Sequence, residues 1–150
     1  MTRQVTNPAG LALIQQFEGL SLTAYRDIAG IWTIGYGHTG GVYKGDTISQ
    51  DEASWLLAQD LAGAEAWVSD RTSSPNSNQF SAMVSLAFNI GNEAFLGSSV
   101  RRFHNTPDFP NAAASFLLWD KAHVDGALVT VQGLLNRRMA EMNLYQTIPS

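Results

Sequence analysis

The chain has 150 residues, of which 45% are hydrophobic and 15% charged, as is typical of a globular protein with its own core and not of a disordered chain. Its net charge of −4 argues against a general nucleic-acid binder, which would carry a basic face. It contains no cysteine, which excludes disulfides and thiolate chemistry. No apolar run approaches the roughly 20 residues of a membrane span. The polar residues 1–8 lack the apolar segment of a signal peptide.

The first helix is predicted to begin at Asn7 and Pro8, because Asn is a favoured N-cap and Pro fits the first helical turn. An apolar stripe at three-residue spacing follows. Gly19 is suited to end this helix, since glycine readily takes the left-handed conformation. Glu18 is therefore expected in the last helical turn.

A small antiparallel sheet is predicted after this helix. Residues 22–26 and 31–36 have the composition of two short strands, and residues 27–30 carry turn residues between them. Val42 and Tyr43 are expected to form a third short strand.

The rest of the chain is predicted to be mainly helical. Residues 49–52 form a capping box that starts a long helix over residues 50–70, and residues 72–77 form a linker. Residues 78–90 are apolar on nearly every side, as in the buried centre of a helical lobe, with Ser81 and Ser85 expected to bond to their own helix backbone. Further helices are expected over residues 98–105, 110–119 and 133–145. Residues 127–131 favour a strand by composition, but we interpret them as a loop or short helix because no partner strand is evident.

Glu18, Asp27 and Thr33 combine two carboxyl groups and a hydroxyl near the predicted hairpin. Cleavage of a glycosidic bond needs one protonated carboxyl group and one ionised carboxylate. Glu18, beside the apolar first helix, is the better candidate for the protonated acid, and Asp27, near Arg26 and water, for the ionised group. Thr33 can orient a water molecule shared with Asp27. Spacing alone supports this weakly, because two carboxylates nine positions apart occur in almost any protein.

A longer pattern strengthens the interpretation. Glu18, eight residues, Asp27, five residues and then Thr33-Ile34-Gly35-Tyr36-Gly37-His38 resemble the signature of the phage-type lysozymes, the endolysins of T4 and lambdoid phages. Four later blocks resemble, in family order, the central helix, the turn after it and the last two segments: residues 79–91, 95–99, 116–119 and 133–141. The resemblance covers nearly the whole chain.

The resemblance implies an α+β, lysozyme-like fold in one domain over residues 1–150. A sheet lobe of about 20–48 and a helical lobe of about 76–150, which includes the N-terminal helix, are joined by a linking helix of about 50–70, with the substrate cleft between the lobes. The implied activity is hydrolysis of the β-1,4 bond between N-acetylmuramic acid and N-acetylglucosamine, with inversion. Glu18 would be the general acid, while Asp27 and Thr33 would position the water. The implied substrate-binding residues are Thr39, Phe88, Asn89 and Ser98.

We expect no cofactor and no metal, because His38, His104 and His123 do not have metal-ligand spacing. His38 is expected to be structural. Phe17 departs from the family, which often has a polar or acidic residue before the catalytic Glu.

The expected partner is the peptidoglycan glycan strand, with no nucleic acid and no membrane insertion. The resemblance further implies a monomer that waits in the host cytoplasm until a separate holin gives access to the periplasm and wall. Two alternatives stay open: a non-catalytic wall-binding protein on the same fold, and a muramidase domain of a bacterial toxin or phage-tail enzyme.

Overall fold

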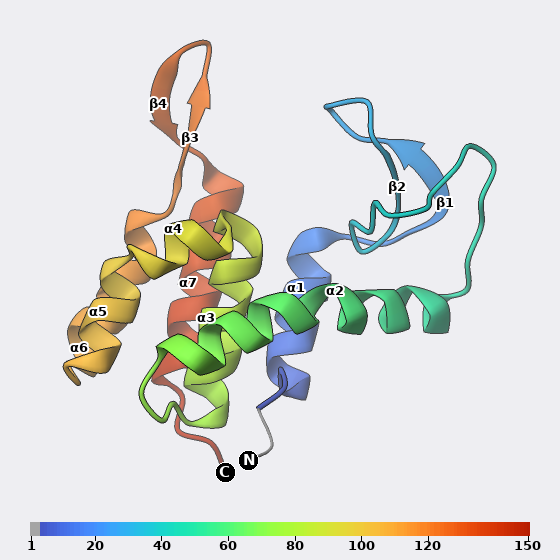
Figure 1. The fold of residues 1–150 in the computed structure, drawn as a ribbon. Helices are drawn as coiled ribbons and strands as arrows, with labels where there is room; N and C mark the ends of the chain where they lie inside the picture. The colour runs from blue at the N-terminus through green and yellow to red at the C-terminus, as the bar shows by residue number, and fades with distance from the viewer. Residues whose placement is uncertain (1–3) are drawn as a thin grey trace. The chain divides into compact units, whose positions relative to one another are not determined.

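The computed structural model describes residues 4–150, and the chain forms two compact units (Figure 1). The small unit comprises residues 14–63. The large unit comprises the described residues up to 13 together with residues 64–150. Two helices, α1 (Pro8–Glu18) and α2 (Gln50–Arg71), each run from one unit into the other. The α+β class is confirmed, since helices dominate and both sheets are small and antiparallel.

The small unit is built around an antiparallel hairpin of β1 (Ser21–Arg26) and β2 (Trp32–Gly35), as predicted. The expected third strand at residues 42–43 is wrong. Neither residue lies in a strand, and Tyr43 begins a turn in which its N–H donates to Asp46 Oδ2 at 2.8 Å. The chain pairs with β1 only after this turn, through a bridge between Thr47 and Thr23. The turn removes the extended geometry that strand pairing needs.

The predicted helix ends of α1 and α2 are confirmed. Asn7 Oδ1 accepts a hydrogen bond from the Gly10 N–H at 2.9 Å at the start of α1, and Gly19 has φ +76° just after its end. At the start of α2, Ser49 Oγ accepts from the Glu52 N–H at 3.1 Å, and Glu52 Oε1 accepts from the Ser49 N–H at 3.2 Å. Residues close to one another in the sequence therefore determine the start and end of α1 and the start of α2.

The large unit is a helical bundle in which α3 (Ser77–Ile90) packs against α7 (Gln132–Gln146). Helix α3 is buried from Asn78 to Ala87, as its apolar composition predicted. The unit is completed by short helices: α4 (Asn92–Leu96), α5 (Ser99–Asn105), α6 (Phe109–Ser115) and the 3₁₀ helix η1 (Phe116–Leu118).

The prediction of a loop or short helix at residues 127–131 is wrong. Residues Ala127–Thr130 form β4, which pairs with β3 (Lys121–Val124) in a hairpin that projects from the helices of the large unit (Figure 1). Its turn is Asp125-Gly126, with φ +50° and +83°. Asp-Gly is a favoured dipeptide for such a turn, because both central residues need positive φ. That dipeptide is the signal that could have identified β3 as the missing partner.

The prediction that Ser81 and Ser85 bond to their own helix is also wrong. Ser81 Oγ accepts from the Asn7 N–H at 2.9 Å, and Ser85 Oγ donates to Glu141 Oε2 at 2.5 Å. A Cβ atom on Gly10 would lie 2.6 Å from Ser81 Cβ. Helices α1 and α3 therefore approach closely here. The hydroxyls of Ser81 and Ser85 form hydrogen bonds with residues outside α3 instead of with their own helix.

A buried cluster of charged residues on α7 is hydrogen-bonded to α3 through Ser85. Glu141 has 0% of its surface exposed, and its carboxylate lies 2.6 Å from Arg138 Nε and 3.3 Å from Arg137 Nε. Burial raises the pKa of the Glu141 carboxyl, and the positive charge of Arg138 opposes this rise. The cluster satisfies charges that would otherwise be costly inside the bundle.

His104 on α5 is buried, with 1% of its surface exposed. Its Nε2 lies 3.0 Å from the Ser73 carbonyl oxygen and its Nδ1 lies 2.7 Å from the Tyr145 hydroxyl. Because the carbonyl can only accept, the ring proton belongs on Nε2, and Nδ1 accepts from Tyr145. Burial lowers the pKa of His104, while the bond to Ser73 opposes this shift.

We expect the protein to lose stability in acid through His104. The unfolded chain binds a proton near the ordinary His pKa of about 6.5, whereas the folded chain binds it only at lower pH. The free energy of unfolding should therefore fall as the pH drops below about 6.5, by up to about 1.4 kcal/mol per pH unit. Urea unfolding of the wild type and His104→Gln at pH 7.0 and 5.0 checks this. An equal acid-induced loss in both proteins would contradict it, and His123→Gln, at an exposed site on β3, is the control.

Candidate active site

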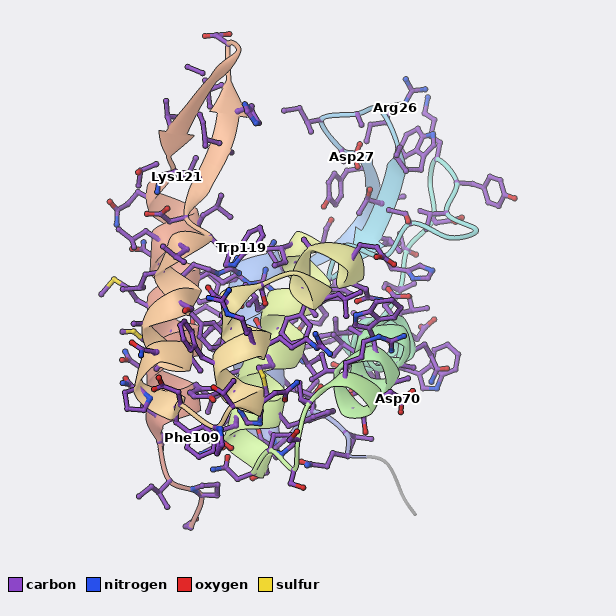
Figure 2. All side chains as sticks on the ribbon, turned by 60° about the vertical axis from the view of Figure 1, so that its left-hand side comes forward. Arg26, Asp27, Asp70, Phe109, Trp119 and Lys121 are labelled. Atoms are coloured by element: carbon purple, nitrogen blue, oxygen red, sulfur yellow. The ribbon has the colours of Figure 1, made fainter. Side chains whose placement is uncertain are left out.

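Asp27 follows β1 in the turn of the small unit's hairpin (Figure 2). Its Oδ1 accepts hydrogen bonds from the backbone N–H groups of Ala29 and Ile31, each at 2.9 Å. The turn itself is closed by the Gly30 N–H, which donates to the Asp27 carbonyl at 2.9 Å, and Gly30 has φ +81°. Within residues 4–150, Oδ2 of Asp27 has no hydrogen-bond partner. One oxygen is therefore anchored, and the other can bind water or substrate.

Thr33 lies on β2 opposite Tyr25 of β1, and only 3% of its surface is exposed. Its hydroxyl donates to the Ile31 carbonyl oxygen at 2.9 Å. The same carbonyl accepts from the Asp27 N–H at 2.9 Å. The backbone of Ile31 thus anchors both Asp27 and Thr33. Because the Thr33 proton is already used, its oxygen can bind a further group only as an acceptor.

Glu18 is the last residue of α1 and is half-buried. A Cβ atom on Gly37, in the turn after β2, would lie 3.3 Å from Glu18 Oε1. Gly37 also has φ +86°, a conformation that favours glycine. The absent side chain and the backbone conformation at Gly37 together make room for the Glu18 carboxyl group. All three candidate catalytic residues thus belong to the small unit.

The four candidate substrate-binding residues are divided between the units. Thr39 is exposed in the small unit, whereas Phe88, Asn89 and Ser98 belong to the large unit. Ser98 is 3% exposed, and its hydroxyl donates to the Phe95 carbonyl at 2.7 Å and caps α5, so it already has a structural task.

Asn89 is exposed at the end of α3 and lines a cavity of about 290 Å³ in the large unit. Phe88, its neighbour on α3, is half-buried. Trp119 and Lys121, labelled in Figure 2, line the same cavity. An indole, an amide and an ammonium group are all groups that bind sugars or anionic substituents, so Trp119 and Lys121 extend the set of candidate residues.

His38 has the structural contacts expected of it. Its Nδ1 lies 2.9 Å from Asp60 Oδ2 on α2, and its Nε2 lies 2.8 Å from the Gly40 carbonyl oxygen. These bonds tie the loop after β2 to α2. In the part of the chain that the structure describes, no group of three or more His, Cys, Asp or Glu side chains could hold a metal ion.

Sequence patterns did not single out Ile31, whose role depends on its backbone. Its N–H and C=O groups can form these hydrogen bonds whatever its side chain is. A pattern of side chains in the sequence therefore does not identify them. Gly37 belongs to the family pattern and Gly30 to the predicted turn, but the roles of both are visible only from their φ values and from the position of Glu18.

Comparison with known proteins agrees with the fold and the motif. The family model described as phage lysozyme matches residues 15–141. An endolysin of Acyrthosiphon pisum secondary endosymbiont phage 1 is 42% identical over 139 residues, which cover 92% of this chain and 95% of the relative. An endolysin of Salmonella phage P22 is 42% identical, covering 91% of this chain and 94% of the relative.

Solved structures agree as well. The muramidase domain of SpmX from Asticaccaulis excentricus superimposes with a TM-score of 0.92 at 36% identity, covering 97% of this chain and 100% of that domain. Among residues 4–150, no helix combines the length and the apolar character needed to cross a membrane. The matched span, the identity and the shared fold establish that this chain belongs to the phage lysozyme family.

Proposed function

We propose that Glu18, Asp27 and Thr33 are the catalytic residues of this endolysin muramidase, which hydrolyses the β-1,4 bond between N-acetylmuramic acid and N-acetylglucosamine in peptidoglycan. The observation that carries the proposal is the arrangement around Ile31. Its backbone holds one Asp27 oxygen and the Thr33 proton, and leaves the second Asp27 oxygen and the Thr33 lone pairs for a water molecule.

The two acceptors define how that water would be oriented. Asp27 Oδ2 and Thr33 Oγ1 both accept, so the water donates one hydrogen to each, and its lone pair points away from both. A lone pair directed at the anomeric carbon makes the water a nucleophile, and Asp27 takes its proton as the C–O bond forms. Thr33 is thus a positioning partner for the water, and Asp27 is the general base.

Glu18 is the proposed general acid. It gives its proton to the glycosidic oxygen as the bond to the anomeric carbon breaks, which lets the sugar leave as a neutral alcohol. Water attacks from the face opposite the leaving group, so the anomeric carbon is inverted. This mechanism needs a separation of about 6.5–9.5 Å between the two carboxyl groups, which leaves space for the water.

The Thr33 hydroxyl can be tested with two variants of similar size. Thr33→Val removes the acceptor for the water, and we expect kcat to fall about tenfold, the effect of about 1.4 kcal/mol in the transition state. Thr33→Ser keeps a hydroxyl and should retain most of the activity. Initial rates of wall lysis, with thermal unfolding as a check on folding, measure both. Full activity of Thr33→Val would remove Thr33 from the mechanism.

The remaining parts of the proposal concern substrate and setting. Thr39, Phe88, Asn89 and Ser98 are proposed to contact the glycan strand. We further propose that the protein acts as a monomer, waits in the host cytoplasm and reaches the wall through a separate holin.

The alternative of a muramidase domain within a bacterial protein is supported by the similarity to the SpmX muramidase domain. The endolysin is favoured because two phage endolysins that are each 42% identical match this chain over 95% and 94% of their own length.

A lysis assay with product identification tests the function. Outer-membrane-stripped cell walls should lose turbidity, and the products should carry new reducing ends on N-acetylmuramic acid. Anhydro-muramic ends would exclude the water-activating role of Asp27. Binding to walls without turbidity loss would favour the non-catalytic alternative.

A further inference from the structure

The small unit contains a second cavity that the proposed chemistry does not use. Its volume is about 360 Å³. It lies between the loop after β2 and the start of α2, and its walls include Ile34 of β2. Successive residues of a strand point to opposite faces, so Ile34 lines this cavity on the face of β2 away from Thr33. The cavity is therefore distinct from the Asp27–Thr33 pair.

The walls of the cavity combine apolar and acidic side chains. Val42, Ile48 and Leu56 form an apolar surface, and Trp55, a residue with 63% of its surface exposed, also lines the cavity. The carboxylates of Asp46 and Glu52 also line it. The one titratable cation-forming group in the lining, His38, is already bonded to Asp60 and to the Gly40 carbonyl.

Both carboxylates retain a free oxygen. Asp46 uses Oδ2 to accept from the Tyr43 N–H at 2.8 Å, and Glu52 uses Oε1 to accept from the Ser49 N–H at 3.2 Å. Within residues 4–150, Oδ1 of Asp46 and Oε2 of Glu52 have no hydrogen-bond partner, and neither residue forms an ion pair. Negative charge beside apolar walls, without a countercharge, favours a cationic ligand.

The net charge of the whole small unit also favours a cationic ligand. It contains two basic side chains, Arg26 and Lys44, and six acidic ones: Glu18, Asp27, Asp46, Asp51, Glu52 and Asp60. Two minus six gives −4, which equals the net charge of the whole chain. The rest of the 150-residue chain therefore has no net charge, and the excess of negative charge that attracts cations lies in the small unit.

We propose that this cavity binds a primary ammonium group on a short aliphatic chain, supplied by the diamino acid in the peptides of the bacterial wall. The methylene groups would pack on the apolar walls, while the ammonium would lie over Trp55 and between the carboxylates of Asp46 and Glu52. This inference rests on the proposed function, because the peptides are attached to the muramic acid units of the glycan that the enzyme cleaves. The cavity thus selects walls in which that amine is free.

Binding can be measured without catalysis. In an NMR titration of the full chain with pentylamine, the Trp55 indole N–H should shift, with Kd on the order of millimolar. The uncharged analogue 1-pentanol should bind far more weakly.

The backbone signals of residues 46–48 report binding in variants. Trp55→Ala and Glu52→Gln should each weaken pentylamine binding about threefold, the range for an exposed cation–π contact or ion pair. Asp51→Asn, a matched loss of a carboxylate outside the cavity lining, should bind as the wild type does.

Lysis of modified walls then tests the source of the amine. Acetic anhydride converts the free wall amines to uncharged amides, and the wild-type KM should rise about threefold or more. Trp55→Ala should already show the raised KM on untreated walls and no further rise on acetylated ones. Pentylamine binding no tighter than 1-pentanol, or an unchanged wild-type KM on walls that are still lysed, would overturn the inference. Failure to lyse either wall would instead contradict the proposed function, and the NMR titration would still decide which ligand the cavity takes.

Discussion

Glu18→Gln is expected to lower the rate of wall lysis by at least about 10²-fold, the usual contribution of a general acid. Glutamine has nearly the same shape as glutamate but has no proton to give to the leaving oxygen. The variant should therefore fold and bind walls while kcat falls. Initial lysis rates over a range of wall concentrations separate kcat from KM, and thermal unfolding reports on the fold.

The matched control is Glu93→Gln, which makes the same chemical change at an exposed position on α4. Its lysis rate should equal that of the wild type. If Glu18→Gln lyses walls as fast as the wild type, the proposed mechanism is wrong. A loss of activity accompanied by unfolding would show that the carboxyl group near Gly37 is structural as well.

Glu141→Gln is expected to lower the free energy of unfolding by about 3–5 kcal/mol, because it removes the carboxylate that lies 2.6 Å from the fully buried guanidinium group of Arg138. The cost of an uncompensated charge inside a helical bundle is large, and Glu141 is fully buried. Urea unfolding followed by circular dichroism gives the change, and the slope with urea should stay the same if only stability is affected.

Glu93→Gln again serves as the control, with an expected change within about 0.5 kcal/mol, as for most surface substitutions. A loss of less than about 1 kcal/mol for Glu141→Gln would mean that the cluster contributes little to stability. The comparison also separates stability from catalysis, since Glu141 lies in the large unit and the candidate catalytic residues lie in the small unit.

Features that depend on a few neighbouring residues were predicted from the sequence. The Asn7 cap, the Ser49–Glu52 capping box and the end of α1 at Gly19 are all set by hydrogen bonds or φ values within one turn. The β1–β2 hairpin was also predicted, because both strands and the turn between them lie within 15 residues. Such interactions are encoded in residue types at fixed spacing, and so they are visible in the chain itself.

Most errors arose where a second segment decides the structure. Residues 127–130 form a strand because β3 pairs with them. The error at residues 42–43 is of another kind, because Tyr43 begins a local turn that Asp46 closes three positions later. Ser81 and Ser85 use their hydroxyls on Asn7 and Glu141, which are 74 and 56 positions away. A pattern within one segment does not report its partner.

The motif from Glu18 to His38, together with the later blocks in family order, was sufficient to identify the family and the α+β fold, because these residues can be matched along the chain without knowledge of their contacts. Tertiary structure alone decided how the stretch is arranged. The backbone of Ile31 anchors both Asp27 and Thr33. The absence of a side chain on Gly37 leaves space for the Glu18 carboxyl group. Backbone groups are the same in every residue, so only folding determines which of them meet a given side chain.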